Sequence, residues 1–197
     1  MTTNPADLSA ELELAHDLAD LADSISLPLF ERRSFTVDWK SNRTEVTEAD
    51  RRAEAAIGDL LAQRRPDHAV FGEEHGTRGP DGAEWCWVID PIDGTSNFVR
   101  GIPVWATLVA LVHRDRGPVV GVVSAPAMQH RWHAATGLGA FRGERRLHVS
   151  NVSSMGDAQV SVTFNDGWDA LGLTPRLVEL QCSAYRARGY GDFWQHM

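Results

Sequence analysis

The chain has 197 residues, of which 43% are hydrophobic and 23% charged, and these values are ordinary for a globular protein. Its formal net charge of −8 argues against a nucleic-acid-binding protein, which usually carries a basic face. No apolar run approaches the roughly 18 residues that cross a membrane, and we expect no secretory leader. The two cysteines form no disulfide framework, so we expect a reduced, cytoplasmic setting without nucleic-acid or membrane partners.

Two amphipathic helices are predicted in the first third of the chain. Residues 7–26 contain neither Gly nor Pro and place leucines at helical spacing, so this helix should close near Pro28. Thr47 is suited to cap a second helix, with Asp50 three positions on as its capping-box partner. This helix should stop at Pro66, since proline cannot continue it.

A large antiparallel sheet is predicted to follow. Its predicted strands are residues 69–71, 85–89, 104–113, 119–124, 131–135, 140–142 and 147–149, and residues 35–39, between the two helices, are predicted as an edge strand. Residues 40–44 and 76–82 are predicted as loops, and residues 114–117 as a hairpin turn between two strands. These elements make up a first part, residues 1–150, that should contain the metal site.

The composition shifts after residues 151–156, and residues 151–197 are predicted to begin a C-terminal α/β part. Its expected elements are a strand at residues 159–164, a helix at 173–182, and a further helix after Gly189-Tyr-Gly191. That last helix would have barely begun at Met197.

Acidic residues gather at the ends of two predicted buried strands. Asp90 and Asp93 follow one strand, and Glu73-Glu74 follows another. Crowded carboxylates repel one another and lose hydration when buried, so such acids generally need a cation. Mg²⁺ takes oxygen ligands and often shares them with phosphate, and the backbone carbonyl of Ile92 is available as a further oxygen. The pattern predicts a metal site for phosphate chemistry.

The residues after these acids are suited to hold a phosphate, although each also has a plainer interpretation. Gly94 permits a close backbone approach, and the amides of Gly94, Thr95 and Ser96 could cradle the anion. The alternatives are a polar turn with side-chain caps from Asp90 to Thr95, loop solubility for one glutamate, and a first-turn helix acid for Asp50. Taken together, these residues favour a site that binds metal and phosphate over the plainer interpretations.

The spacing of the two aspartates separates two kinds of phosphatase. Haloacid-dehalogenase-type enzymes carry Asp-x-Asp-Gly-Thr, in which the first Asp is the nucleophile and one residue lies between the two acids. In this chain two residues lie between Asp90 and Asp93. This spacing favours metal-activated water over an aspartyl-phosphate intermediate.

Several motifs resemble the inositol monophosphatase superfamily. They are Val46-Thr-Glu-Ala-Asp50, Gly72-Glu73-Glu74 and Asp90-Pro-Ile-Asp93-Gly-Thr95, while residues 97–105, 121–126 and 189–193 resemble its histidinol-phosphate phosphatase branch. The resemblance implies an α/β fold of the inositol monophosphatase and fructose-bisphosphatase kind, a layered αβαβα sandwich, often homodimeric. It also implies hydrolysis of a small phosphorylated substrate with two or three Mg²⁺ per active site.

The resemblance further implies a role for each candidate residue. Glu73, Asp90 and the Ile92 carbonyl would hold one metal, Asp90 and Asp93 a second, and Asp50 would lie near a third. Asp50 would pair with Thr95 to orient the attacking water, so the catalytic candidates are Thr95, Asp50 and Glu73. The phosphate would be bound by Gly94, Thr95 and Ser96.

Asp192 is the candidate for substrate specificity. It precedes the last predicted helix, where it is either an ordinary N-terminal helix acid or a carboxylate that meets the ammonium of a histidinol-like substrate. Arg188 is a further candidate for substrate binding, with a solvated surface charge as the plainer interpretation. Trp105 is more simply explained as a core residue.

One expected part of the family pattern is missing from the sequence. The superfamily usually continues with a Trp-Asp-x-Ala motif whose Asp completes the second metal site, and Trp168-Asp169 stands in the wrong place for it. We therefore expect a truncated C-terminal part and a weakly bound second metal. A fragment of a longer enzyme is favoured over a degenerate relative.

The sequence thus predicts a cytoplasmic, Mg²⁺-dependent phosphomonoester hydrolase. Its expected reaction converts L-histidinol phosphate to L-histidinol by metal-activated water, in histidine biosynthesis. An inositol-1-phosphate or broad sugar-phosphate monophosphatase is the alternative within the same class. An inactive, truncated dimerisation module is the alternative of another class.

Overall fold

The computed structural model describes residues 8–41 and 44–197, which form two compact units. The first unit ends at Leu147 and the second begins at His148. Residue 7 of the first predicted helix and residues 42–43 of the predicted polar loop lie outside the described residues. Helices and strands are mixed in both units, which confirms the predicted α/β class.

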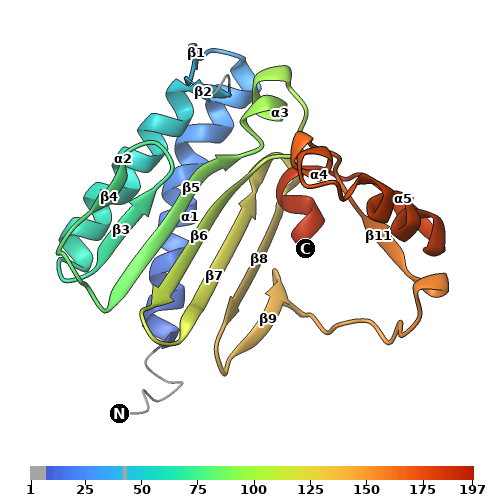
Figure 1. The fold of residues 1–197 in the computed structure, drawn as a ribbon. Coiled ribbons are helices and arrows are strands. Elements are labelled where there is room, and N and C mark those ends of the chain that lie inside the picture. Colours follow the sequence, from blue (N-terminus) through green and yellow to red (C-terminus); the bar gives the residue numbers. More distant parts are fainter. Residues whose placement is uncertain (1–7, 42–43) are drawn as a thin grey trace. The chain divides into compact units, whose positions relative to one another are not determined.

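A large mixed sheet forms the framework of the first unit (Figure 1). Its strands are β3 (Ala69–Gly72), β4 (Gly76–Arg78), β5 (Trp85–Asp93), β6 (Ala106–His113), β7 (Gly117–Ala125), β8 (His130–Ala135), β9 (Gly139–Arg142) and β10 (Arg145–Arg146). They lie in the order β10-β9-β8-β7-β6-β5-β3-β4, and all neighbours are antiparallel except β3 and β5.

The prediction of an entirely antiparallel sheet is therefore wrong at one pair of strands. The cause is β4, which lies in a segment predicted as loop. This strand pairs back along β3 and returns the chain to the end of the sheet where β3 begins. The chain then enters β5 from that end, so β5 runs parallel to β3. As a result, Gly72 at the end of β3 is paired with Ile89 of β5.

Two helices, α1 (Leu8–Arg32) and α2 (Glu48–Arg64), cover one face of the sheet (Figure 1). Small and branched apolar side chains from both helices pack against β5, β6 and β7. The buried core here includes Leu14, Leu18, Ala22, Ile57, Leu61, Trp87, Ile89, Val109, Leu111 and Val122. A short antiparallel hairpin, β1 (Val37–Trp39) and β2 (Glu45–Thr47), connects the two helices.

The expectation that the first helix closes near Pro28 is wrong, because α1 continues through this residue to Arg32. A proline inside a helix removes a hydrogen bond and costs about 3 kcal/mol. Leu27, Leu29 and Phe30 pack on a second apolar cluster, which is formed by Ala49, Ile92, Phe98 and Trp105. Since fully burying one such side chain contributes about 1.5–3 kcal/mol, three partly buried ones together offset the cost of the proline.

The last strand of the sheet is also displaced from its predicted position. Residues 147–149 were expected to extend the meander, but the edge strand is β10, and Val149 is 95% exposed. Arg145 pairs with Arg142 across a two-residue loop in which Gly143 has a φ of +56°. Such a tight hairpin returns the chain at once, so the last backbone hydrogen bond of this pair is donated by Leu147, to the Ala140 carbonyl at 2.8 Å.

The second unit contains a small parallel pair of strands joined by helices. Its elements are the 3₁₀ helix η3 (Met155–Asp157), β11 (Gln159–Ser161), α4 (Asp166–Ala170), α5 (Thr174–Ser183), β12 (Arg186–Arg188) and the 3₁₀ helix η4 (Asp192–His196). The helix expected after Gly191 is thus a 3₁₀ helix. No helix in either described range has the length and apolarity needed to cross a membrane.

Candidate functional site

Asp90 and Asp93 lie on β5 itself, where the strand forms a bulge. The pairing with β6 shifts register between these two residues. Residues three apart on a regular strand point to opposite faces, whereas a bulge adds one residue and re-aims the side chains. Pro91 has no N–H to leave unpaired at this point, and the Thr107 hydroxyl donates to its carbonyl at 2.9 Å. The bulge therefore brings the two aspartates close enough for the charge of Asp93 to contribute to the raised pKa of Asp90.

Glu54 on α2 organises the turn that carries the glutamate pair. Its buried carboxylate accepts hydrogen bonds from the backbone N–H groups of Glu74 and His75, at 2.7 and 2.8 Å. It also lies 2.8 Å from His75 Nδ1. Sequence reasoning missed this residue, although its position four residues after Asp50 places both acids on one helix face. The turn is thus fixed directly to α2.

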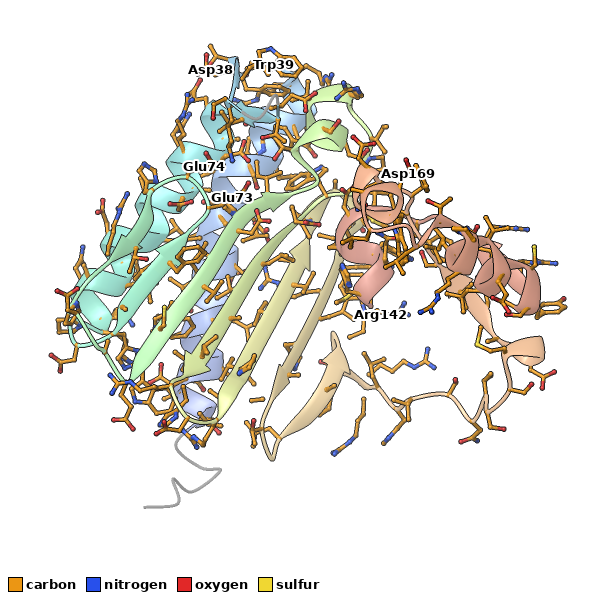
Figure 2. The ribbon with its side chains drawn as sticks, viewed as in Figure 1. Asp38, Trp39, Glu73, Glu74, Arg142 and Asp169 are labelled. Carbon is orange, nitrogen blue, oxygen red and sulfur yellow. The ribbon has the colours of Figure 1, made fainter. Side chains whose placement is uncertain are left out.

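Gly72 leaves the space that this carboxylate occupies. A Cβ atom at Gly72 would lie 2.2 Å from Glu54 Oε1, closer than such contacts can be. Glu73 and Glu74 then follow at the end of β3, as Figure 2 shows. The Glu73 side chain is 46% exposed and that of Glu74 is 8% exposed, so the two neighbouring acids have different environments.

Asp50 connects the beginning of α2 to Thr95. The backbone N–H and the hydroxyl of Thr47 both donate to Asp50 Oδ2, at 2.8 and 2.6 Å, and complete the predicted capping box. The Thr95 hydroxyl lies 3.2 Å from Asp50 Oδ1 and 3.0 Å from the Ile92 carbonyl oxygen. Asp50 is fully buried. The same carboxylate therefore caps a helix and contacts a candidate catalytic hydroxyl.

The short helix α3 (Thr95–Arg100) carries the candidate phosphate-binding residues. Gly94 precedes it with a φ of +89°, a left-handed conformation that glycine adopts without strain. Phe98 is fully buried against Phe30, Phe35 and Trp105. The buried Phe98 side chain thereby anchors the helix to the core. Trp105 is itself a core residue, as predicted.

Ser96, the last of these phosphate-binding candidates, is held by Arg100. One guanidinium nitrogen of Arg100 donates to the Ser96 hydroxyl at 2.6 Å and to its carbonyl at 2.9 Å. The same nitrogen lies 2.9 Å from the carboxylate of Glu45 on β2. The hairpin before α2 is therefore tied to the helix that follows the bulge.

Burial, with neighbouring negative charges, raises the pKa of two carboxyl groups of the site. Burial, together with the charges of Glu73 and Asp93 and a hydrogen bond with Glu73, raises the pKa of Asp90 to about 8. Burial raises the pKa of Asp50 to about 6, against hydrogen bonds from Thr47 that lower it. The Asp90–Glu73 hydrogen bond needs a proton, and the raised pKa of Asp90 means that Asp90 can supply it at neutral pH.

Lys40, which lies in the predicted polar loop, brings a positive charge to the site. Its Nζ lies 2.8 Å from Glu73 and 2.6 Å from Glu74. Burial lowers its pKa and the hydrogen bonds that it donates to the two glutamates raise it, with a net upward shift. The only hint in the sequence was a lysine ten residues before Asp50, which by itself does not identify a partner.

The oxygen donors fit a hard divalent cation by their chemistry. Carboxylates whose pKa rises because they are buried beside other carboxylates gain from a positive charge placed between them. The side chains are not arranged as a closed cage, however. Within residues 8–41 and 44–197, no three His, Cys, Asp or Glu side chains already surround a point where an ion would fit. Closing around a metal would require side chains such as Glu73 to turn from their present partners.

Asp192 and Arg188 belong to the second unit. Arg188 is the exposed last residue of β12, and its Nη1 donates to the Ala187 carbonyl at 2.7 Å. Asp192 begins η4 with a φ of +40°, directly after Gly191 at +80°. The candidates of the first unit, in contrast, come together from β3, β5, α2 and α3.

Comparison with known sequences identifies a family. A model of the inositol monophosphatase family matches residues 7–168. A histidinol-phosphatase of Streptomyces coelicolor is 45% identical, over 97% of this chain and 74% of that protein. A histidinol-phosphatase of Mycobacterium tuberculosis is 46% identical, over 93% of this chain and 72% of that protein.

A solved structure agrees with this similarity. The extragenic suppressor protein suhB from Bartonella henselae superposes with a TM-score of 0.81 at 26% sequence identity. The match covers 93% of this chain and 71% of that one. The chain therefore shares the fold of that protein over nearly all of its length.

Proposed function

The chain belongs to the inositol monophosphatase family, and on that premise we propose that it hydrolyses L-histidinol phosphate to L-histidinol and inorganic phosphate. The observation that carries the choice of substrate is the identity of 45% and 46% with two histidinol-phosphatases over almost the whole chain. The proposed enzyme is cytoplasmic and homodimeric. Each active site uses two or three Mg²⁺ ions.

The proposed metal ligands are the oxygen atoms gathered at the ends of β3 and β5. Glu73, Asp90 and the Ile92 carbonyl would hold one ion, Asp90 and Asp93 a second, and Asp50 would lie beside a third. When bound, Mg²⁺ supplies positive charge that stabilises the transferred phosphoryl group and lowers the pKa of a water. The raised pKa of Asp90 supports this assignment, because burial and neighbouring carboxylates disfavour its charged form and a bound cation would stabilise it.

Asp50 and Thr95 are proposed to orient the attacking water. With a pKa of about 6, Asp50 is mostly ionised above neutral pH and can accept a hydrogen bond from the Thr95 hydroxyl. The Thr95 oxygen is then free to accept a hydrogen bond from water. Because Asp50 is fixed by Thr47 at the beginning of α2, this pair needs little reorganisation during the reaction.

The remaining candidates are proposed to hold the two ends of the substrate. The first N–H groups of a helix have no partner within it, which supports phosphate binding by the amides of Gly94, Thr95 and Ser96. Asp192 is proposed to accept hydrogen bonds from the substrate ammonium, with Arg188 nearby in sequence as a further contact. A carboxylate opposite an ammonium would select an amino-alcohol phosphate over an uncharged polyol phosphate.

Phosphate release from three esters tests this function. The protein is assayed with L-histidinol phosphate, inositol 1-phosphate and glycerol 2-phosphate, each with Mg²⁺ and with EDTA, and Asp93→Asn serves as a matched background. We expect Mg²⁺-dependent release with the highest kcat/KM for histidinol phosphate, and a lower preference for it in Asp192→Asn. Equal kcat/KM values for the three esters would contradict the proposed substrate. Release that persists in EDTA would contradict the proposed metal.

A further inference from the structure

Trp39 on β1 exposes an aromatic ring next to the candidate site. Its exposed fraction is 66%, whereas every other tryptophan of the described chain is buried or half-buried. An indole combines a large apolar surface with a π-face that attracts flat rings and cations. Single exposed apolar residues are common, so its position has to decide whether this one has a function.

The hairpin places Trp39 within one residue of the carboxylate cluster. The following residue, Lys40, donates its backbone N–H to the Thr44 carbonyl at 2.8 Å and directs its ammonium to Glu73 and Glu74. Figure 2 shows the hairpin residue Trp39 beyond the end of β3 that carries the two glutamates. The end of β1 is therefore fixed over the site.

The register of the hairpin determines which way the indole faces. Trp39 is paired with Glu45, and paired residues project from the same face of a ribbon. Glu45 reaches Arg100, which in turn holds Ser96 of the proposed phosphate-binding segment. Trp39 is therefore on the face of the hairpin that looks toward α3.

The neighbouring residue supports this assignment. Asp38 projects from the opposite face of β1 and pairs with Arg51 on α2. An acid on one face thus fixes the hairpin to α2, while the aromatic ring on the other face stays open. The exposure of the Trp39 ring is therefore a consequence of how the hairpin is fixed to α2.

We propose that Trp39 is a specificity residue that stacks on the flat ring of the substrate while the phosphate is held at α3. This inference rests on the proposed function, because histidinol phosphate carries an imidazole ring and polyol phosphates carry none. Aromatic pairs contribute enough to change affinity by about 2- to 12-fold. An imidazolium over indole adds a cation–π attraction. Trp39 thereby distinguishes esters by their distal group.

Steady-state kinetics of Trp39→Ala and Trp39→Phe with saturating Mg²⁺ test the proposal. In Trp39→Ala we expect KM for histidinol phosphate to rise about 5-fold, with kcat unchanged within about twofold. KM for glycerol 2-phosphate, which has no ring, should not change. Trp39→Phe should recover most of the loss because it restores an aromatic face. Val37→Ala, on the same face of β1, is the matched control and should behave as the wild type.

The outcomes separate this inference from the function on which it rests. A wild-type protein with no preference for histidinol phosphate would refute the proposed function. If the wild type prefers histidinol phosphate and Trp39→Ala keeps that preference, the role of Trp39 is refuted but the proposed function is not. An equal rise of KM for both esters would also refute it, since the hairpin would then be acting on the site as a whole. Sedimentation velocity provides the last check, because a change of oligomeric state in Trp39→Ala would assign the ring to a subunit interface.

Discussion

Gly72 shows how little space separates the acids of the site from the helix behind them. The carboxylate of Glu54 occupies the volume that a side chain at position 72 would need. That carboxylate cannot move away without giving up its hydrogen bonds to Glu74 and His75. Glycine is therefore required here for close packing. Its φ lies outside the left-handed region, so backbone conformation is not the reason.

Gly72→Ala should consequently damage both stability and activity. Because the added methyl group meets a fixed carboxylate, we expect a loss of about 1–3 kcal/mol in the free energy of unfolding. Displacement of Glu73 should lower kcat/KM by at least about tenfold. Gly121→Ala is the control, since a Cβ there meets nothing within 4 Å. Urea unfolding and phosphate release measure the two effects, and equal behaviour of both variants would contradict the packing argument.

At the scale of whole elements, an ionic network fixes α1 to the sheet. Arg131 on β8 lies 2.7 Å from Asp20 and 2.6 Å from Asp23, both on α1. Its Nε donates to the hydroxyl of Ser124 on β7, which in turn donates to Asp23. Burial raises the pKa of Asp23, against these hydrogen bonds that lower it. The arginine therefore compensates a carboxylate that would otherwise be poorly solvated.

Arg131→Met should destabilise the fold but spare the chemistry. Removing one partner leaves Asp23 partly buried without its cation, and because Arg131 is about a quarter exposed we expect a loss of about 1–3 kcal/mol. Activity per folded molecule should stay near the wild-type value. Arg142→Met, at an exposed position on β9, should change stability by less than about 0.5 kcal/mol. Equal denaturation midpoints for the two variants would refute this assignment.

Local signals predicted most elements, while tertiary packing decided the rest. The capping box at Thr47 and Asp50 was evident because both partners lie three residues apart. Continuation of α1 past Pro28 depended on apolar contacts with residues about seventy positions away. The parallel pairing of β5 with β3 followed from β4, a three-residue strand without hydrophobic alternation. Short polar strands give no periodic signal.

The candidate site divides in a similar way. Asp90, Asp93 and Glu73 could be selected from sequence because several acids at strand ends form an unusual pattern. Glu54 and Lys40 could not, since one is an ordinary helix acid and the other an ordinary loop cation until their partners are known. Residues whose role depends on neighbours distant in the sequence cannot be identified from sequence spacing.

At the scale of the whole molecule, the charge cluster links stability to pH. The folded-state pKa of Asp90 is about 8 and its ordinary value is 3.8. Between these values the folded protein retains a proton that the unfolded chain has released, so the free energy of unfolding falls as pH rises. Asp50 acts in the same direction up to about pH 6. The metal-free protein should therefore be more stable in mild acid than at alkaline pH.

Urea unfolding in EDTA should show a decrease on the order of 1–3 kcal/mol between pH about 5.5 and pH about 8. Asp90→Asn should remove most of this decrease because the amide does not titrate. Mg²⁺ at 100 times its dissociation constant should restore about 2.7 kcal/mol to the wild type at the higher pH. The same Mg²⁺ concentration should stabilise Asp90→Asn much less. A pH profile that is identical in the two proteins would exclude Asp90 as the cause.

Asp50 both completes the capping box of α2 and contacts Thr95. This has a consequence for how the sequence changes in relatives that no longer need enzymatic activity. Asp50 closes the capping box of α2 and so keeps a folding role in a lineage without activity. Asp90 accepts one backbone hydrogen bond, from Ile92, and its negative charge opposes folding. In such relatives, Asp90 would therefore be substituted earlier than Asp50. In a newly found homologue, an aspartate at position 90 is the better sign of a working enzyme.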